Sequence, residues 1–233
     1  MDNLLVPLKS LLPQYGWCRC MQEIEELSVG GSIRFKGGVK FRRISIGGAL
    51  RIDGDGEGEE LVVSGSANVL GTLRVKKLKV SGSMSIGKNL ICGEGEIAGS
   101  ISVDGNVECN SIDVSGSFKT SKIRSKSIEV SGSLKVDEAI ANNIRIGRRS
   151  KVRGTLVGTN VVIGRDAEVE DIIGDDVRIE KGASVRSVEA INVVIERRAE
   201  VSEVKYVNKA DISNEAEVER IIKIESLSRE LPK

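Results

Sequence analysis

Histidine, the side chain most often used for acid–base and metal chemistry, does not occur in this sequence. The chain of 233 residues has 35 Lys and Arg residues, 34 Asp and Glu residues and a formal net charge of +1. Without imidazole, the sequence excludes a Ser-His-Asp or Cys-His nucleophile pair, a His-liganded zinc or haem and a His general base. We expect no catalytic residue, no cofactor and no metal ion, and therefore no enzyme. Because both signs of charge are interspersed, we also expect no nucleic-acid partner.

Four cysteines are the remaining candidates for redox or metal chemistry. Cys18 and Cys20 have neither a second pair at metal spacing nor a histidine, so a closed zinc site is not expected there. Cys92 and Cys109 are 17 residues apart, and we expect both to be small apolar thiols in the core. So few cysteines do not make a secreted disulfide framework, and reduced thiols in a cytoplasmic protein are expected.

Two short charged segments could bind ions. Residues 53–60 read Asp-Gly-Asp-Gly-Glu-Gly-Glu-Glu, which begins like a calcium loop, but Ser64 stands where that template needs Glu. Gly56 and Gly58 also replace an apolar pair, which favours a solvated loop that bulges from the fold. Residues 148–153 contain four Arg and Lys residues that could contact phosphate or an acidic lipid surface, although a solvated corner is the commoner structure.

A repeat of about 17 residues must position all of these side chains. Glycines recur at this spacing, and most are preceded by Val-Ser and followed by Ser. They are Gly31, Gly48, Gly65, Gly82, Gly99, Gly116 and, after 16 residues, Gly132. The repeat then continues through isoleucines spaced by 16 or 17 residues, and all but the first are followed by a second short pattern of Ala, a polar residue and Val. These isoleucines are Ile146, Ile163, Ile179, Ile195 and Ile212.

Each repeat has six apolar positions arranged as three pairs, with one residue between the members of a pair. Spacing by two is the signature of strands whose alternate side chains face the same side. Gly, Ser, Asn and Asp between the pairs predict sharp corners, because these residues tolerate positive φ. Three short strands per repeat then close into a three-sided coil, whose apolar residues stack on those of the next coil.

The sequence therefore predicts an all-β fold, a single-stranded parallel β-helix with a triangular cross-section. We expect about 11 to 12 coils of 16–17 residues and, at ~4.8 Å per coil, a rod roughly 55 Å long. Paired aliphatic residues and the general handedness of parallel crossovers favour a right-handed helix. We assign residues 1–27 to an N-terminal tail, cap or membrane-contacting segment, residues 28–222 to the β-helix and residues 223–233 to a C-terminal tail or cap.

The terminal segments decide whether the ends of the rod stay open, because an uncovered ladder edge is a template for another chain. The N-terminal segment either caps the first coil or lies at the headgroup level of a membrane. Candidates for membrane contact are Leu4, Leu5, Leu8, Leu11, Leu12 and Trp17. Residues 223–231 could form one or two helical turns over the last coil, or could be a frayed tail. Neither segment resembles a strong blocking cap, so end-to-end association is expected.

The Val-Ser-Gly-Ser and Ile-Ala-Gly-Ser corners, the apolar pairs between them and the Ile-Glu-Lys-Gly-Ala-Ser-Val segment at 179–185 resemble the bactofilins, the polymer-forming cytoskeletal proteins. The resemblance covers residues 28–222. It implies a right-handed triangular β-helix that stacks into filaments without nucleotide, sometimes tethered to a membrane by a short N-terminal segment. The partner is then a second copy of the chain, and the interface consists of the end coils. Its candidate residues are Val29, Ile33, Phe35, Val218, Ile221 and Ile222.

Two other functions are compatible with a β-helix. Carbohydrate-binding and polysaccharide-active β-helices place acidic and basic side chains in a groove along one outer face, whereas the acidic residues here are spread around the coil. A β-helix with capped ends can also serve as an adaptor that presents its faces to a protein partner. The state of the two ends therefore discriminates between a filament and an adaptor.

Overall fold

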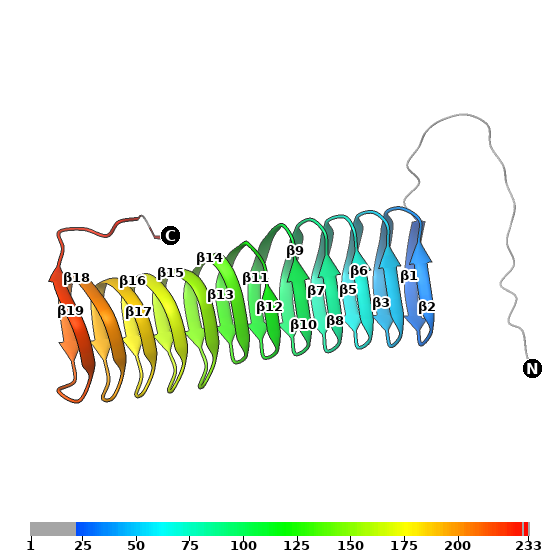
Figure 1. Cartoon of the computed structure of the whole chain (residues 1–233). Coiled ribbons are helices and arrows are strands. Elements are labelled where there is room, and N and C mark those ends of the chain that lie inside the picture. The colour runs from blue at the N-terminus through cyan, green and yellow to red at the C-terminus, as the bar shows by residue number, and fades with distance from the viewer. Residues whose placement is uncertain (1–21, 230, 233) are drawn as a thin grey trace, which may run out of the picture.

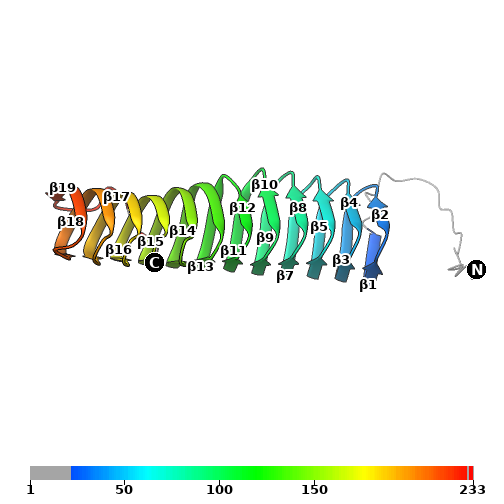
Figure 2. The same ribbon diagram turned by 60° about the horizontal axis from the view of Figure 1, so that its bottom comes forward.

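Parallel strands stacked coil upon coil make up the described chain. The computed structural model describes residues 22–229, 231 and 232, in which 19 strands join one parallel sheet. Figures 1 and 2 show these strands as a rod, with β1 at one end and β19 at the other. The described residues contain no helix. The parallel β-helix predicted from the sequence is confirmed, with about 12 turns.

In the first half of the rod, each coil consists of a longer and a shorter strand. The longer strands are β1 (Gln22–Val29), β3 (Val39–Ile46), β5 (Gly56–Val63), β7 (Leu73–Val80), β9 (Leu90–Ile97) and β11 (Asn106–Val114). The shorter strands are β2 (Ser32–Phe35), β4 (Ala49–Ile52), β6 (Ser66–Val69), β8 (Ser83–Ile86), β10 (Ser100–Val103) and β12 (Ser117–Lys119). Each strand pairs in register with the equivalent strand one coil later.

In the second half, the two strands of a coil merge. β13 (Lys122–Val130) is the last strand that matches the longer strands of the first half. From β14 (Ser133–Ile146) onward, one continuous strand runs around each coil. The remaining strands are β15 (Lys151–Ile163), β16 (Glu168–Ile179), β17 (Ser184–Ile195), β18 (Glu200–Ile212) and the shorter β19 (Glu217–Lys223).

Long strands bend around the corners of the coil without losing their ladder. In β3, the buried Phe41 and Ile44 are separated by two exposed residues, Arg42 and Arg43. Two successive exposed residues mark a corner, because a straight strand alternates. The expectation of three separate short strands per repeat is therefore wrong. The apolar pairs still face the core, but some corners have no turn, and there one strand continues from one face of the coil to the next with its hydrogen bonds to the neighbouring coils.

The corner glycines are required by the close approach of neighbouring coils. A Cβ added at Gly65 would lie 2.0 Å from the carbonyl oxygen of Gly48, and one at Gly82 would lie 1.9 Å from that of Gly65. These glycines do not have φ in the left-handed region. The expectation of positive φ at these corners is therefore wrong, and any side chain there would push successive coils apart.

Left-handed backbone occurs instead in the second half, where the same corner is longer. Arg149, Asp166 and Arg198 have φ of 57°, 56° and 57°, and Gly182 has φ of 71°. Each is followed by a buried small residue, such as the Ala after Gly182. A left-handed residue costs an L-amino acid roughly 1–2 kcal/mol, so this turn is kept only because the coils on either side hold it.

The acidic segment 53–60 is not a bulging loop, and that expectation is wrong. Residues 56–60 belong to β5, which pairs in register with β3 and β7. A Cβ on Gly58 would lie 2.3 Å from Cε2 of Phe41 in the preceding coil. The Phe41 ring therefore fills the space that a side chain at Gly58 would occupy, and the apolar column continues through the glycines.

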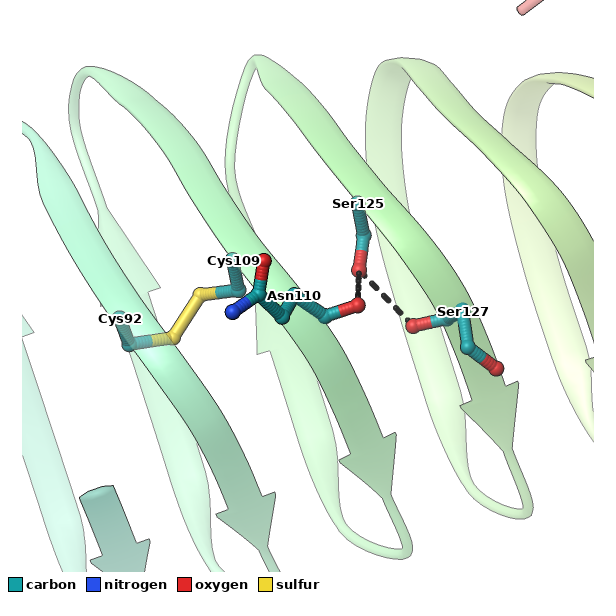
Figure 3. Close-up of a disulfide and its surroundings, with 5 residues drawn as sticks. All are labelled: Cys92, Cys109, Asn110, Ser125 and Ser127. Carbon is teal, nitrogen blue, oxygen red and sulfur yellow. Dashed lines mark hydrogen bonds between the residues drawn. A yellow bond between two sulfur atoms is a disulfide. The ribbon is translucent and has the colours of Figure 1, made fainter. Parts of the chain in front are cut away.

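Cys92 and Cys109 form a disulfide between neighbouring coils, so the expectation of reduced thiols is wrong for this pair. Their predicted place in the core is confirmed, because both side chains are buried. They are register partners in β9 and β11 with Cα atoms 4.6 Å apart, within the range that a disulfide needs. Figure 3 shows the bond joining two adjacent strands, with the Ser125 hydroxyl of the next coil 3.0 Å from the carbonyl oxygen of Asn110.

The C-terminal tail lies along the outside of the rod. Figures 1 and 2 show it turning back from β19 toward β15. The Thr159 hydroxyl donates a hydrogen bond to the carbonyl oxygen of Pro232 at 3.1 Å, and Arg229 forms an ion pair with Glu138. The described residues of the tail form no helix, so the helical turns that the sequence allowed over the last coil are absent there, and the tail passes alongside earlier coils.

Candidate assembly interface

At the N-terminal end of the described rod, the apolar core columns are only partly buried. Core residues of inner coils, such as Ile44 and Val63, are fully buried. In the first coil, Ile24, Leu27 and Val29 occupy the columns of the core but are only partly buried. Within the described chain, β1 pairs with β3 and with no strand on its outer edge. An edge of this kind can pair with a further strand through its N–H and C=O groups.

The C-terminal end is open in the same way. β19 pairs with β18 and, in the part of the chain that the structure describes, has no strand on its other side. Val218 and Ile212 are partly buried against the core, and the Ile221 side chain is 52% exposed. Partly buried apolar residues of the same end are Tyr206, Ala210 and Ala216. Among residues 22–229, 231 and 232, the core columns therefore have no further coil beyond β1 or beyond β19.

The structure divides the predicted interface residues between the two ends. Val29 and Ile33 are partly buried in the first coil. Val218 and residues 221–222 lie in β19, where each retains exposed surface. Phe35 differs from the others, because it is only 7% exposed and packs inside the shaft. It supports the first coil and offers little surface to a partner.

Two further residues of the N-terminal edge, Ile24 and Leu27, were missed by the sequence analysis. β1 already begins at Gln22, inside the segment assigned to the N-terminal tail. Both residues precede core residues of β3 by one repeat, and this spacing was a signal that could have found them. The residues proposed for membrane contact, Leu4, Leu5, Leu8, Leu11, Leu12 and Trp17, lie outside the described residues.

The first four coils carry charges of alternating sign along one corner. The charged residues are Glu23, Glu25 and Glu26 in β1, Lys40, Arg42 and Arg43 in β3, Glu57, Glu59 and Glu60 in β5, and Arg74, Lys76 and Lys77 in β7. Arg43 lies 3.4 Å from Glu60, and Lys77 lies 3.4 Å from Glu94. Such exposed pairs each add little to stability. Within these four coils, the register partners in β1, β3, β5 and β7 carry charges of opposite sign.

Hydrogen bonds keep several of these groups ionised. Lys76 donates a hydrogen bond to Glu59 at 2.5 Å and lowers the pKa of that carboxyl group. Near the other end, the hydrogen bond from Lys205 lowers the pKa of Glu203, and Arg220 adds a weaker contact at 3.4 Å. These hydrogen bonds favour the charged form of Glu59, in the third coil, and of Glu203, near the C-terminal end.

Shallow grooves follow the outer faces of the rod. One, over the shorter strands, is lined mainly by small side chains such as Ser83 and Ser100, and another is lined by charged side chains of β15 to β19. The described residues contain no group of three or more His, Cys, Asp or Glu residues that could hold a metal ion. None of the elements from residue 22 onward is a helix long and apolar enough to cross a membrane.

Comparisons of the chain with models of protein families, with curated proteins and with solved structures find no match.

Proposed function

We propose that this protein is a bactofilin-like cytoskeletal scaffold that assembles end to end into filaments without nucleotide. The main support is the partly exposed core column at each end of the rod, which includes Val29 at one end and Ile221 at the other. A further coil would bury these side chains, and burial is favourable by about 25 cal/mol per Å² of apolar surface. The edge strands can also continue their ladders across the junction. The partner is a second copy, and the role is structural and not enzymatic.

The same proposal places the protein in the cytoplasm, with the segment that precedes β1 as a tether to the membrane surface. Cytoplasmic thiols are reduced in most organisms, so the Cys92–Cys109 disulfide needs an explanation. Intracellular proteins of hyperthermophiles are rich in disulfides, and a cytoplasm of this kind fits the bond.

Negative-stain electron microscopy of the full-length protein without nucleotide, across a range of salt, tests the proposal. We expect thin, unbranched filaments. Val29→Lys or Ile221→Lys should abolish them, because burial of an unpaired ammonium group in the junction is costly. Leu70→Lys is a matched control, since Leu70 is 43% exposed on the side of the rod, and filaments should persist in this variant.

Circular dichroism of each variant establishes that the rod remains folded. Wild-type protein that stays as single rods at all concentrations and salts would contradict the proposal and favour an adaptor. Filaments that persist in both end variants would reject the end coils as the interface.

A further inference from the structure

One outward-facing column of the rod changes from exposed to covered near the middle. It runs through register partners from β11 to β17. Glu108 and Arg124 of this column are exposed, whereas its residues from Ile140 to Glu189 are buried or half-buried. Val157 is only 2% exposed, although it points away from the shaft and does not belong to the hydrophobic core cluster. A neighbour outside the coil must therefore cover this part of the column.

The C-terminal tail is that neighbour, and acidic side chains of the rod contact its basic part. Arg229 forms an ion pair with Glu138 of β14, and the Ser228 N–H donates a hydrogen bond to the carboxylate of Glu189 in β17. Glu138 also pairs with Lys122 of β13, so Arg229 is its second cation. The covered side of the rod thus offers carboxylate oxygens to a chain that passes over it, and it suits a segment with a positive charge.

Apolar residues of the tail gather on the same side of the rod. Leu227, Leu231 and Pro232 are half-buried, although none of them belongs to the core. The Thr159 hydroxyl donates a hydrogen bond to the carbonyl oxygen of Pro232 at 3.1 Å, and Thr159 lies two residues after Val157 on the same side of β15. Figures 1 and 2 show the tail turned back from β19 along the rod. Its described residues beyond β19 form neither helix nor strand, so the tail lies on the rod as an extended peptide.

We propose that this side of β14 to β17 is a docking site for an extended segment of a protein partner, and that the tail is an intramolecular ligand that keeps the site closed. The site, here called the docking face, consists of Glu138, Ile140, Val157, Ile173 and Glu189. The partner segment carries a basic residue between apolar residues, because this is the chemistry that the tail brings to the face. The inference concerns the side of the rod and does not depend on end-to-end assembly.

The occupant that replaces the tail is a different protein and not a second copy. The tail of a second copy would make the same contacts as the resident tail and bind no more tightly. The resident tail has the advantage of its covalent link, which gives it an effective concentration of about 1 mM or more. Only a segment that binds the docking face more tightly than the tail can therefore displace it.

Full-length protein with a released tail tests the docking face. Arg229→Glu places a carboxylate beside Glu138 and should release the tail, because like charges repel. The probe is a fluorescent synthetic peptide with the sequence of residues 223–233, and binding is measured by anisotropy. It should bind the variant at least about tenfold more tightly than the wild type, whose own tail occupies the site. Lys223→Glu is the matched control, since this residue still lies in β19, and it should bind the probe as weakly as the wild type.

Two further changes identify the surface that binds the probe. Val157→Lys in the Arg229→Glu chain should abolish binding, because an ammonium group replaces the apolar contact. A probe that itself carries Arg229→Glu should also fail to bind. Circular dichroism verifies that each variant retains the β-helix.

The contrary outcomes are distinct. Equal and measurable binding of the probe to the wild type and to Arg229→Glu would overturn the role of the tail as an intramolecular ligand. A chain that ends at residue 223 has no tail to compete, so a lack of binding both there and in Arg229→Glu would overturn the docking face. Oxidation of a chain with Glu138→Cys and Arg229→Cys should form a disulfide within one copy. Disulfide-linked dimers would instead make a second copy the occupant and overturn the assignment to a different protein.

Discussion

Gly58 depends on a side chain in the neighbouring coil, because the Phe41 ring occupies its side-chain position. Gly58→Val should force the ring to move and should lower the free energy of unfolding by about 1–3 kcal/mol. Phe41→Val in the same chain makes room for the new side chain and should recover most of the loss. Guanidinium unfolding measures both effects. Glu57→Val, on the exposed side of β5, is the control, and equal losses in the single and double variants would show that the ring is not the obstacle.

Asp53 links stability to pH at the residue scale. Its carboxylate accepts hydrogen bonds from Nε of Arg51 at 2.8 Å and from Nε of Arg34 at 2.7 Å, and these bonds lower its pKa below the ordinary value of 3.8. A carboxyl group with a lowered pKa in the folded state stabilises the fold above its unfolded pKa, and this contribution is lost as the pH falls through the folded pKa. The contribution of Asp53 should therefore disappear below pH 3.8.

Asp53→Asn removes the titrating carboxyl group. The variant should melt at a lower temperature than the wild type at neutral pH, and the difference should shrink toward zero as the pH approaches about 2. Thermal unfolding between these limits measures it. A difference that stays constant with pH would show that protonation of Asp53 does not affect stability.

For single residues, the sequence predicted which side chains are buried but did not predict the contacts that they make. The apolar column placed Cys92 and Cys109 in the core, where they are found. Their bond depends on the distance between stacked coils, which the sequence does not contain. The same holds for Gly65, whose repeat marks a corner, because its contact with the backbone of Gly48 exists only once the coils are stacked.

At the scale of elements, alternation predicted which residues face the core but not where strands end. The pattern suggested a loop at residues 53–60, because Gly56 and Gly58 carry no apolar side chain. β5 forms there because its ladder uses backbone groups, and β3 and β7 provide partners on both sides. A neighbour in register can therefore impose a strand on a segment that the pattern assigns to a loop.

The C-terminal tail covers an apolar position on the outside of the rod. Val157 belongs to an outward-facing column that continues through Ile173 to Glu189, yet it is only 2% exposed. The hydrogen bond from Thr159 to Pro232 places the tail beside it. The sequence could not predict this path, because the tail has no repeat and its contacts are specific to one face.

Deletion of residues 224–233 tests this role of the tail. The β-helix should remain folded, because its core columns do not include the tail, whereas Val157 and Ile173 should become exposed. We expect stronger binding of a hydrophobic dye and some sideways association, because contiguous exposed apolar surface favours aggregation. Val157→Ser in the shortened chain should reduce the dye signal again. Equal dye fluorescence in the full and shortened chains would contradict the covering role.

At the scale of the whole molecule, the repeat predicted the architecture because counting repeats counts coils. The ends are different, because a repeating pattern does not say what covers its first and last units. The expected boundary at residue 28 lies within the first coil, since β1 begins at Gln22.

The direction of the ladder hydrogen bonds determines how the rod responds to tension. These bonds join one coil to the next along the axis, so a pull on the two ends loads the coil boundaries in series and the weakest one opens first. Coils would then unwind one at a time, as expected for a repeat protein whose units contact only their neighbours. The Cys92–Cys109 bond crosses one boundary near the middle, with 17 residues of sequence separation. Stretching would stop at this covalent link, so the rod can lengthen from both ends while its central coil stays closed.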